Sequence, residues 1–337
     1  MRVGVVGASG FTGAELLRLC AAHPSFDVVV AGADTQAGQP VAALYPSLAA
    51  AYPDLELTTV GPDELDGLDV VFLGLPHGQA QQLVPSLVGR VGLIVDLSAD
   101  FRLHDAAAYP QWYGKAHEAP DLLGKFVYGL PELFGASLPG ASLVAAPGCY
   151  PTAAALALAP LVRAGVVEPS GIVVDAASGV SGAGRSATAS THFNTVDEDF
   201  TAYGLLTHRH TPEMEQAIGA QVLFTPHLVP MNRGILATCY ARPSAAVTGE
   251  DVLAALTDAY AGSPFVVVSE RVPSTKATLG SNAAHLTARL DRRTGWIVSL
   301  CALDNLGKGA SGQAVQCANL ALGLDEATGL SAVGVYP

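Results

Sequence analysis

The sequence predicts two α/β domains: a Rossmann-type doubly wound parallel sheet, then an α+β domain with a mixed, mostly antiparallel sheet. Three observations predict this arrangement. A glycine-rich loop joins a first strand-like run to a helical run, and further buried strand-like runs follow up to about residue 150. Beyond that point, strand-like runs have fewer helices between them. The 337 residues also exceed the usual single domain, so two domains are expected.

The chain begins with a βαβ unit. Residues 2–6 (RVGVV) predict a strand, GASGFTG at 7–13 opens a helix over AELLRLCAAH, and DVVVAGAD at 27–34 predicts a second strand. This order implies a parallel sheet with a right-handed crossover. Residues 35–55, rich in Ala and Pro, are interpreted as an excursion from this domain. Further strand-like runs of the first domain are at 69–76, 92–98 and 142–149.

The pattern changes after residue 150, where most runs read as strands of the second domain. These strand candidates are at 171–182, 205–218, 222–229, 234–242, 265–271, 282–290 and 295–303. The last segment, KGASGQAVQCANLAL at 308–322, has an apolar helical period and is expected to return to the first domain.

Composition excludes several classes of protein. Half of the residues are hydrophobic and 14% are charged, which is typical of a compact enzyme and not of a disordered chain. The net charge of −13 repels polyanions, so we expect no nucleic-acid partner. Five widely spaced cysteines without a CxxC pair predict a reducing, cytoplasmic location. We expect no membrane segment, because no apolar stretch approaches the roughly 18 residues needed to span a bilayer.

The glycine loop predicts a dinucleotide site. Glycines permit a tight turn and the close approach of a pyrophosphate, whose charge the N-terminus of the following helix favours. Asp34 lies roughly 20 residues beyond the last glycine, where an acidic group commonly binds the ribose of NAD. Thr35 and Gln36 could instead face the 2′-phosphate of NADP, so the spacing leaves both cofactors open. The glycines of the GxxGxxG motif are Gly7, Gly10 and Gly13.

One cysteine has an unusual position, in PGCYPTAAALAL at 147–158. The alanine run favours a helix, and Pro151 suits its first position, where no N–H is needed, so Cys149 should lie at or just before the helix start. Unpaired N–H donors and the positive end of the helix dipole favour a thiolate there. The alternative is a small buried cysteine at a turn.

Two further patterns carry chemistry. His208 and His210 in HRH would share one strand face if the segment were extended, and histidine can transfer protons near neutral pH. A structural role is the alternative, and we expect no metal site because ligands at standard spacing are missing. Arg102 and Arg185 suit a phosphate or carboxylate, or else surface ion pairs. SGVSGAG, at 178–184, could present N–H groups as an anion nest.

With these features together, the chain resembles the N-acetyl-γ-glutamyl-phosphate reductases of arginine biosynthesis, a family of the aspartate-semialdehyde dehydrogenase superfamily. The resemblance runs nearly end to end. APGCYPT together with HRHTPE is far more specific than any glycine motif. The motifs that carry it, in the order of the family, are GASGFTGAELLRL, LGLPHG, DLSADFRL, YGLPEL, APGCYPT, SGVSGAGR, HRHTPE and DNLGKGASGQAVQ.

The resemblance implies roles for individual residues. Cys149 corresponds to the nucleophile and His208 to the acid/base, with His210 and Glu213 as supporting or rival groups; which histidine transfers the proton stays open. The cofactor would be NADP(H), although Asp34 departs from this expectation. The implied cofactor-binding residues are Gly7, Ser9, Gly10, Phe11, Thr12, Gly13, Thr35, Pro76, His77, Ser178, Gly179, Gly182, Asn305 and Lys308. The implied substrate-binding residues are Arg102, Ser181 and Arg185.

The implied reaction is the NADPH-dependent reduction of N-acetyl-L-glutamyl 5-phosphate to N-acetyl-L-glutamate 5-semialdehyde, with release of inorganic phosphate, through a thioester on Cys149. The expected domains are a dinucleotide-binding domain at 1–148, a catalytic and oligomerisation domain at 149–305, and a C-terminal helix at 306–337. A homodimer or homotetramer is expected from the large second sheet. Three alternatives remain: aspartate-semialdehyde dehydrogenase, a reductase of aminoadipyl phosphate, and a non-catalytic NADP sensor.

Overall fold

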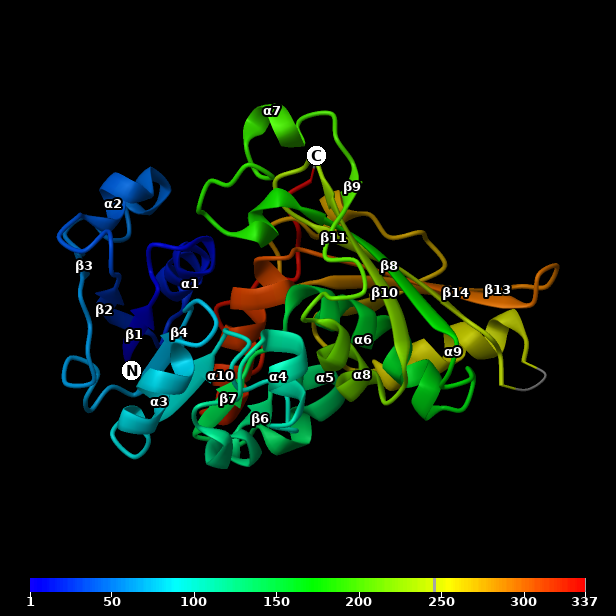
Figure 1. The fold of residues 1–337 in the computed structure, drawn as a ribbon, viewed down its shortest axis with the longest axis horizontal. Helices are drawn as coiled ribbons and strands as arrows, with labels where there is room; N and C mark the ends of the chain where they lie inside the picture. The colour runs from blue at the N-terminus through cyan, green and yellow to red at the C-terminus, as the bar shows by residue number, and fades with distance from the viewer. Residues whose placement is uncertain (245–246, 337) are drawn as a thin grey trace. The chain divides into compact units, whose positions relative to one another are not determined.

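The chain folds into two compact units. The computed structural model describes residues 1–244 and 247–336 (Figure 1). The N-terminal unit consists of Met1–Pro147 and Ala310–Leu330, and the C-terminal unit of Gly148–Gly309 and Ser331–Pro337. The end of the chain therefore contributes first to one unit and then to the other.

The N-terminal unit contains a seven-stranded sheet in the order β3-β2-β1-β4-β5-β7-β6, in which every pairing is parallel. β1 is the third strand from one edge, between β2 and β4, because the βαβ crossovers extend the sheet to both sides of it. The strands are β1 (Arg2–Val6), β2 (Asp27–Gly32), β3 (Leu57–Thr58), β4 (Val70–Leu73), β5 (Leu93–Asp96), β6 (Val127–Tyr128) and β7 (Leu143–Ala145).

Helices cover both faces of this sheet, because its strands are apolar on both sides. In β4, Val70 and Phe72 belong to one hydrophobic cluster, which includes side chains of α1 and α10, whereas Val71 and Leu73 belong to the other, which includes side chains of α3. The helices of this unit are α1 (Phe11–Ala22), α2 (Val41–Leu44), α3 (Ala80–Leu87), α4 (Ala108–Tyr113), α5 (Pro131–Phe134) and α10 (Gly312–Ala321), with 3-10 turns at Pro46–Leu48, Pro120–Lys125 and Gly135–Ser137.

The C-terminal unit contains a second seven-stranded sheet in the order β12-β13-β14-β11-β8-β10-β9. Four of its six pairings are antiparallel, and β8–β10 and β12–β13 are parallel. The predicted fold class is thus confirmed. The strands are β8 (Ile172–Gly179), β9 (Thr201–Ala202), β10 (Val222–Val229), β11 (Ile235–Ala241), β12 (Val266–Val268), β13 (Ala284–Asp291) and β14 (Trp296–Leu303).

Helices pack on one face of the second sheet (Figure 1). α6 lies against β11 and β14, and α8 and α9 flank it. Along β8 and β11, buried residues alternate with half-buried ones, so the opposite face of these strands is only partly covered. The remaining elements are α6 (Cys149–Arg163), α7 (Phe193–Val196), α8 (Thr211–Ile218), α9 (Gly249–Ala259), 3-10 turns at Val180–Ala183 and Thr275–Thr278, and a π-helical turn at Gly307–Ser311.

One predicted strand is wrong. The segment 205–218 forms a turn followed by α8, with Pro212 in the first helical turn and Gly219 in a left-handed conformation at its end. Met214, Ala217 and Ile218 are buried at helical spacing. The proline start and glycine stop therefore override the extended reading of this segment.

Candidate active site

The glycine loop is closely packed between β1 and α1. Gly7 has a φ of +84°, and a Cβ there would lie 2.3 Å from the carbonyl oxygen of Gly74. A Cβ on Gly13 would lie 2.3 Å from the oxygen of Gly7. Within the described part of the chain, no side chain caps α1 at Gly10, so its first N–H groups are left for another acceptor. Such a helix start fits a pyrophosphate.

The residues after β2 are open to solvent. Asp34 and Thr35 are exposed, and the side chain of Gln36 donates a hydrogen bond to the carbonyl oxygen of Thr35. The sequence has no lysine or arginine between Arg18 and Arg90. A 2′-phosphate at this edge would therefore meet hydroxyl and amide groups of this segment, and the Asp34 carboxylate would oppose it.

Cys149 is the first residue of α6, in agreement with its predicted place at the helix start, although Pro151 is the third helical residue and not the first. Gly148 is the N-cap, and its N–H donates to Oε1 of Glu213 at 2.8 Å. The Glu213 side chain is fully buried. Gly309 is also close, because a Cβ there would lie 2.9 Å from Cβ of Cys149. The position of the thiol is thus fixed by a helix start, a buried carboxylate and a glycine.

The two histidines lie in the turn before α8, not on a strand face. His210 is the N-cap of α8, and its N–H donates to Nδ1 of His208 at 3.1 Å. The two ring centroids are 4.8 Å apart. The prediction that they share a strand face is wrong, because the chain turns here to begin the helix; they nevertheless lie side by side.

Aromatic rings surround His208. Its ring centroid lies 5.7 Å from that of Tyr150, 5.5 Å from that of Tyr203 and 5.3 Å from that of Phe224. Burial, with a smaller contribution from Arg209, lowers the pKa of His208 from 6.5 to about 4. His208 is therefore neutral near pH 7. Because Tyr150 directly follows Cys149, this cluster is joined to the start of α6.

The SGVSGAG segment uses most of its first N–H groups within the fold. The N–H groups of Gly179, Val180 and Ser181 donate to the carbonyl oxygens of Gly234, Met231 and Asn232, respectively. The predicted anion nest is thus wrong for these three donors, because they are already bonded to main-chain acceptors.

Asn305 lies behind this segment. Its Oδ1 accepts the Gly234 N–H at 2.7 Å, and its Nδ2 donates to Oγ of Ser181 at 2.9 Å. The Oγ of Ser178 donates to the carbonyl oxygen of Gly179. Asn305 therefore holds the segment in place, and Lys308, fully buried, follows it along the chain.

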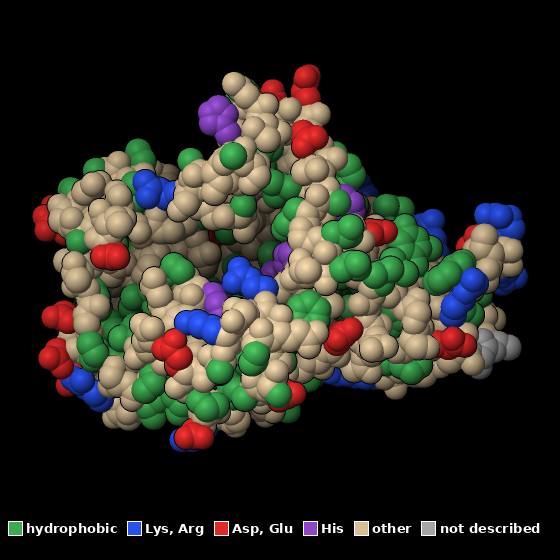
Figure 2. Space-filling view, in the orientation of Figure 1, with side chains coloured by type: hydrophobic (Ala, Val, Ile, Leu, Met, Phe, Trp, Pro, Cys, Tyr) green, Lys and Arg blue, Asp and Glu red, His purple; other side chains and the backbone are tan. Residues whose placement is uncertain are grey.

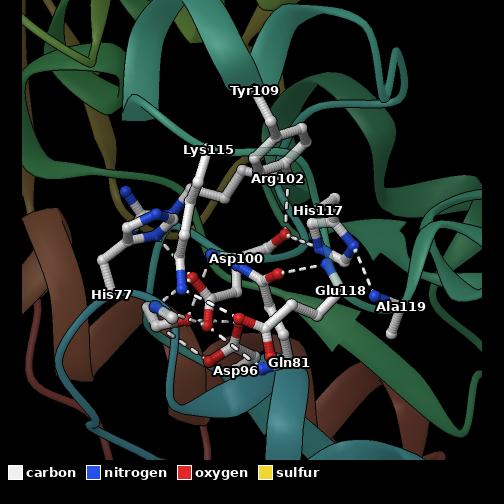
Figure 3. A network of polar contacts seen from close by, with 12 residues as sticks. His77, Gln81, Asp96, Asp100, Arg102, Tyr109, Lys115, His117, Glu118 and Ala119 are labelled. Atoms are coloured by element: carbon white, nitrogen blue, oxygen red, sulfur yellow. Dashed lines mark hydrogen bonds and ion pairs between the residues drawn. The ribbon is translucent and has the colours of Figure 1, made fainter.

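In the N-terminal unit, Arg102 and His77 belong to one polar network (Figure 3). The buried Arg102 guanidinium donates from Nε to the carbonyl oxygen of Ala146 at 2.8 Å and from Nη2 to that of Leu97 at 2.7 Å. Two main-chain oxygens thus fix its orientation. Nδ1 of His77 lies 2.5 Å from Oδ1 of Asp100.

Comparisons with known proteins agree with this arrangement. A family model described as "Semialdehyde dehydrogenase, NAD binding domain" matches residues 2–141, and one described as "Semialdehyde dehydrogenase, dimerisation domain" matches residues 149–305. The N-acetyl-gamma-glutamyl-phosphate reductase of Symbiobacterium thermophilum is 51% identical, covering 100% of this chain and 99% of the relative. This chain belongs to the N-acetyl-γ-glutamyl-phosphate reductase family. The resemblance predicted from its motifs is therefore confirmed.

Other similar proteins agree. The N-acetyl-gamma-glutamyl-phosphate reductase of Desulforudis audaxviator is 47% identical over the full length of both chains. A crystal structure of aspartate semialdehyde dehydrogenase II from Vibrio cholerae superposes with a TM-score of 0.69 at 17% identity, covering 95% of this chain and 97% of the other. At this identity the superposition supports the fold alone.

Arg185, expected to bind substrate in this family, lies in an exposed segment. Residues 182–190 and 197–207 are exposed throughout. Figure 2 shows acidic side chains near α7, at the top of the view, where Asp197 and Asp199 are exposed.

One contributor to the site was missed by sequence reasoning. Glu213 was expected as a supporting or rival group beside the histidines, and the structure adds its contact with the Gly148 N–H. Asp100, in DLSADFR, was not singled out at all, although it contacts His77. The only signal in the sequence was its place within DLSADFRL, one of the motifs that carry the resemblance.

No group of three or more His, Cys, Asp or Glu side chains able to hold a metal ion occurs in residues 1–244 and 247–336. Over the same residues, no helix is both long and apolar enough to cross a bilayer. The five cysteines, all described, form no disulfide with one another.

Proposed function

We propose that this protein reduces N-acetyl-L-glutamyl 5-phosphate to N-acetyl-L-glutamate 5-semialdehyde and phosphate in arginine biosynthesis, with NADPH as the reductant. The observation that carries the proposal is the placement of Cys149 at the start of α6, held by the Glu213–Gly148 hydrogen bond. The names of the full-length relatives support the choice of substrate.

The Cys149 thiolate would attack the acyl carbon, and inorganic phosphate would leave, so that a thioester remains on the sulfur. In this scheme, the reacting carbonyl oxygen would lie at the N-terminus of α6, where the first N–H groups of the helix face it. They would stabilise the negative charge that develops there. The bound nicotinamide would supply the hydride that reduces the thioester.

A histidine would then give a proton to the oxyanion of the resulting thiohemiacetal and take it back as the carbon–sulfur bond breaks. The aldehyde leaves and the thiolate is restored. His208 and His210 are the candidates, as both rings contact Tyr150, the neighbour of the thiol. Because His208 is neutral near pH 7, the proton that it gives would first have to reach it from the Cys149 thiol as the thiolate forms.

For the cofactor, the start of α1 would hold the pyrophosphate through the N–H groups of the 7–13 loop. We propose NADP(H), with Thr35 and Gln36 toward the 2′-phosphate. The remaining proposed cofactor contacts come from Pro76, His77, Ser178, Gly179, Gly182, Asn305 and Lys308. For the substrate, Arg102 is the preferred partner of an anionic group, because its guanidinium is already oriented. Ser181 and Arg185 are the other proposed substrate contacts.

The reverse reaction tests the proposal. Purified protein is mixed with phosphate, NADP⁺ and N-acetylglutamate semialdehyde, and the absorbance of the reduced cofactor is followed. We expect phosphate-dependent reduction that the Cys149→Ser variant loses while it still binds NADP⁺. Activity with aspartate semialdehyde alone would assign a different substrate, and tight NADP⁺ binding without turnover of either aldehyde would favour a sensor. Parallel reactions with NAD⁺ measure the cofactor preference.

We also propose that two copies associate through the partly covered face of the second sheet. This face carries largely apolar side chains, and Leu223 is 51% exposed. Phe200, 63% exposed, stacks on His227 of β10 with ring centroids 5.0 Å apart, which extends the face. Apolar surface of this kind is typical of a contact between subunits. The half-buried apolar side chains of this face include Val173, Ala177, Leu236, Tyr240, Val298 and Leu300.

The oligomeric state tests this interface. We expect light scattering to give at least two copies for the wild type and a smaller assembly for Leu236→Asp. Ala254→Asp, a matched charge on the exposed side of α9, should keep the wild-type mass. A monomeric wild type would contradict the proposal. We further propose a cytoplasmic location, since cysteines without disulfides fit a reducing compartment; cell fractionation tests it.

A further inference from the structure

Asp100 holds the start of α3 from a different loop. Its carboxylate is fully buried and accepts the N–H of Gly78 at 2.8 and 3.0 Å, one distance to each oxygen. It also accepts the N–H of Gln81 at 3.1 Å. In the described chain, α3 has no side-chain cap from its own N-cap residue, Gln79. Asp100 therefore supplies the acceptors that the helix start lacks.

The same carboxylate contacts His77, which precedes Gly78. Nδ1 of His77 lies 2.5 Å from Oδ1 of Asp100, and the imidazole ring lies 4.4 Å from the ring of Tyr113. Burial alone would raise the pKa of Asp100, but the contact with His77 and the hydrogen bond from Gly78 outweigh it and lower that pKa. The carboxylate is thus charged near neutral pH and can hold His77 and the helix start together.

Asp100 is itself fixed from the other side. Its carbonyl oxygen accepts the hydroxyl of Tyr109 at 2.5 Å and contacts Nε2 of His117 at 2.8 Å. Its N–H donates to Oγ of Ser98 at 3.1 Å. Figure 3 shows Asp100 between these groups, with His77 and Gln81 below it and Tyr109 and His117 above and to the right. An acceptor held in this way can set the geometry of a neighbouring loop.

Asp96, the last residue of β5, provides a contrast. It is also fully buried, but its carboxylate accepts only local donors, the N–H of Ser98 at 3.0 Å and the Ser98 hydroxyl at 2.8 Å. Burial raises the pKa of Asp96 to about 7. A buried carboxylate only four residues before Asp100 therefore need not contact α3, and the contacts with the start of α3 are specific to Asp100.

The hydrogen bonds of Asp100 also distinguish the start of α3 from the start of α1. The donors at the start of α3 are occupied by Asp100, whereas α1 has no side-chain cap at Gly10 among the described residues. We therefore expect the anionic part of a ligand at the start of α1. The segment before α3 would contact the ligand through the His77 side chain and by van der Waals packing.

We infer that Asp100 is a positioning residue for the cofactor: it fixes the segment 76–79 and the side chain of His77 against the bound dinucleotide. This rests on the proposed function, which places Pro76 and His77 beside the cofactor. Asp100 itself acts through these residues. Loss of the Asp100 carboxylate should therefore weaken cofactor binding and leave the chemical step largely intact.

The test compares Asp100→Asn with Asp96→Asn, a matched loss of a buried carboxylate. Asparagine keeps the size of the side chain, but it replaces one carboxylate oxygen by an NH₂ group, which cannot accept the N–H groups of Gly78 and Gln81. We expect the Kd for NADP⁺, measured by calorimetry, and its KM to rise about tenfold in Asp100→Asn. We expect kcat within about threefold of the wild type, and we expect Asp96→Asn to leave the Kd unchanged.

Two further measurements keep the test decisive. Amide hydrogen exchange at Gly78 and Gln81 should quicken in Asp100→Asn and not in Asp96→Asn. His77→Gln, which keeps the acceptors of α3, should also raise the Kd for NADP⁺, and adding it to Asp100→Asn should have less than an additive effect. If Asp100→Asn does not fold, the Kd of His77→Gln decides.

An unchanged Kd in Asp100→Asn, with faster exchange at Gly78, would overturn the inference and leave Asp100 as a helix cap only. A fall in kcat at constant Kd would overturn it as well, since the residue would then act on the chemistry. If the wild type binds NADP⁺ but converts neither aldehyde, the proposed reaction fails, while the Kd values still test the role of Asp100.

Discussion

Replacing Glu213 by alanine should both destabilise the C-terminal unit and displace Cys149. Glu213 is fully buried, and its Oε1 accepts the Gly148 N–H at 2.8 Å. Removing the acceptor leaves a buried donor unsatisfied, which costs about 1–3 kcal/mol, and the truncated side chain leaves a cavity that adds about 1 kcal/mol. We expect the free energy of unfolding to fall by about 2–4 kcal/mol in total.

The effect on activity follows from the position of Gly148, directly before the thiol. A reacting group displaced by about 1 Å can lose on the order of 10²-fold in rate, and we expect a fall in kcat of that size. Glu215→Ala is the matched control on α8, because its Oε1 accepts the N–H of Val222 at 3.2 Å, away from Cys149. It should cost about 1 kcal/mol of stability and leave kcat within about twofold.

Urea unfolding and turnover of the semialdehyde measure the two effects. Glu213→Gln separates positioning from proton transfer, because an amide oxygen still accepts the Gly148 N–H but cannot transfer a proton at neutral pH. We expect Glu213→Gln to keep its stability within about 1 kcal/mol and most of its activity. A Gln variant as inactive as the Ala variant would refute the positioning role and assign Glu213 to the chemistry.

Three further outcomes are expected. Gly309→Ala should lower kcat and cost about 1–3 kcal/mol of stability, because its Cβ would lie 2.9 Å from Cβ of Cys149; unchanged turnover would contradict this contact. The pKa of His208 is 6.5 in the unfolded chain and about 4 in the folded one, so the unfolded chain binds the proton first as the pH is lowered. In urea titrations, lowering the pH from 6.5 to 4 should therefore reduce the free energy of unfolding of the wild type by up to about 3 kcal/mol more than that of His208→Gln. An equal fall in both proteins would show that His208 is not the cause. Thr248→Ala removes the acceptor of the Asp251 N–H at the start of α9 and should cost about 1 kcal/mol in urea unfolding without changing kcat; a stability equal to the wild type would show that this exposed cap contributes nothing.

The sequence by itself determined the features that depend on near neighbours along the chain. The glycines at 7–13 between a strand and a helix predicted the nucleotide-binding fold. Within this turn, a Cβ on Gly10 or Gly13 would face the oxygen of Gly7, whereas the close approach of Gly7 to the distant Gly74 is not recorded by any local pattern. Pro151 and the alanine run placed Cys149 at a helix start, since helix formation is decided by residues within a few positions. The motif order identified the family.

The tertiary structure alone decided which distant groups meet. Glu213 and Gly148 are 65 residues apart in the chain, and Asp100 and Gly78 are 22 apart. The extended reading of 205–218 failed on a local signal, since Pro212 and Gly219 mark the start and stop of α8, but only the structure shows that the ring of His208 packs among Tyr150 and other aromatic side chains from separate segments. Local pattern fixes a residue's backbone conformation, whereas the partner of a buried carboxylate or imidazole is set by how the elements pack, and no spacing in the sequence records that packing.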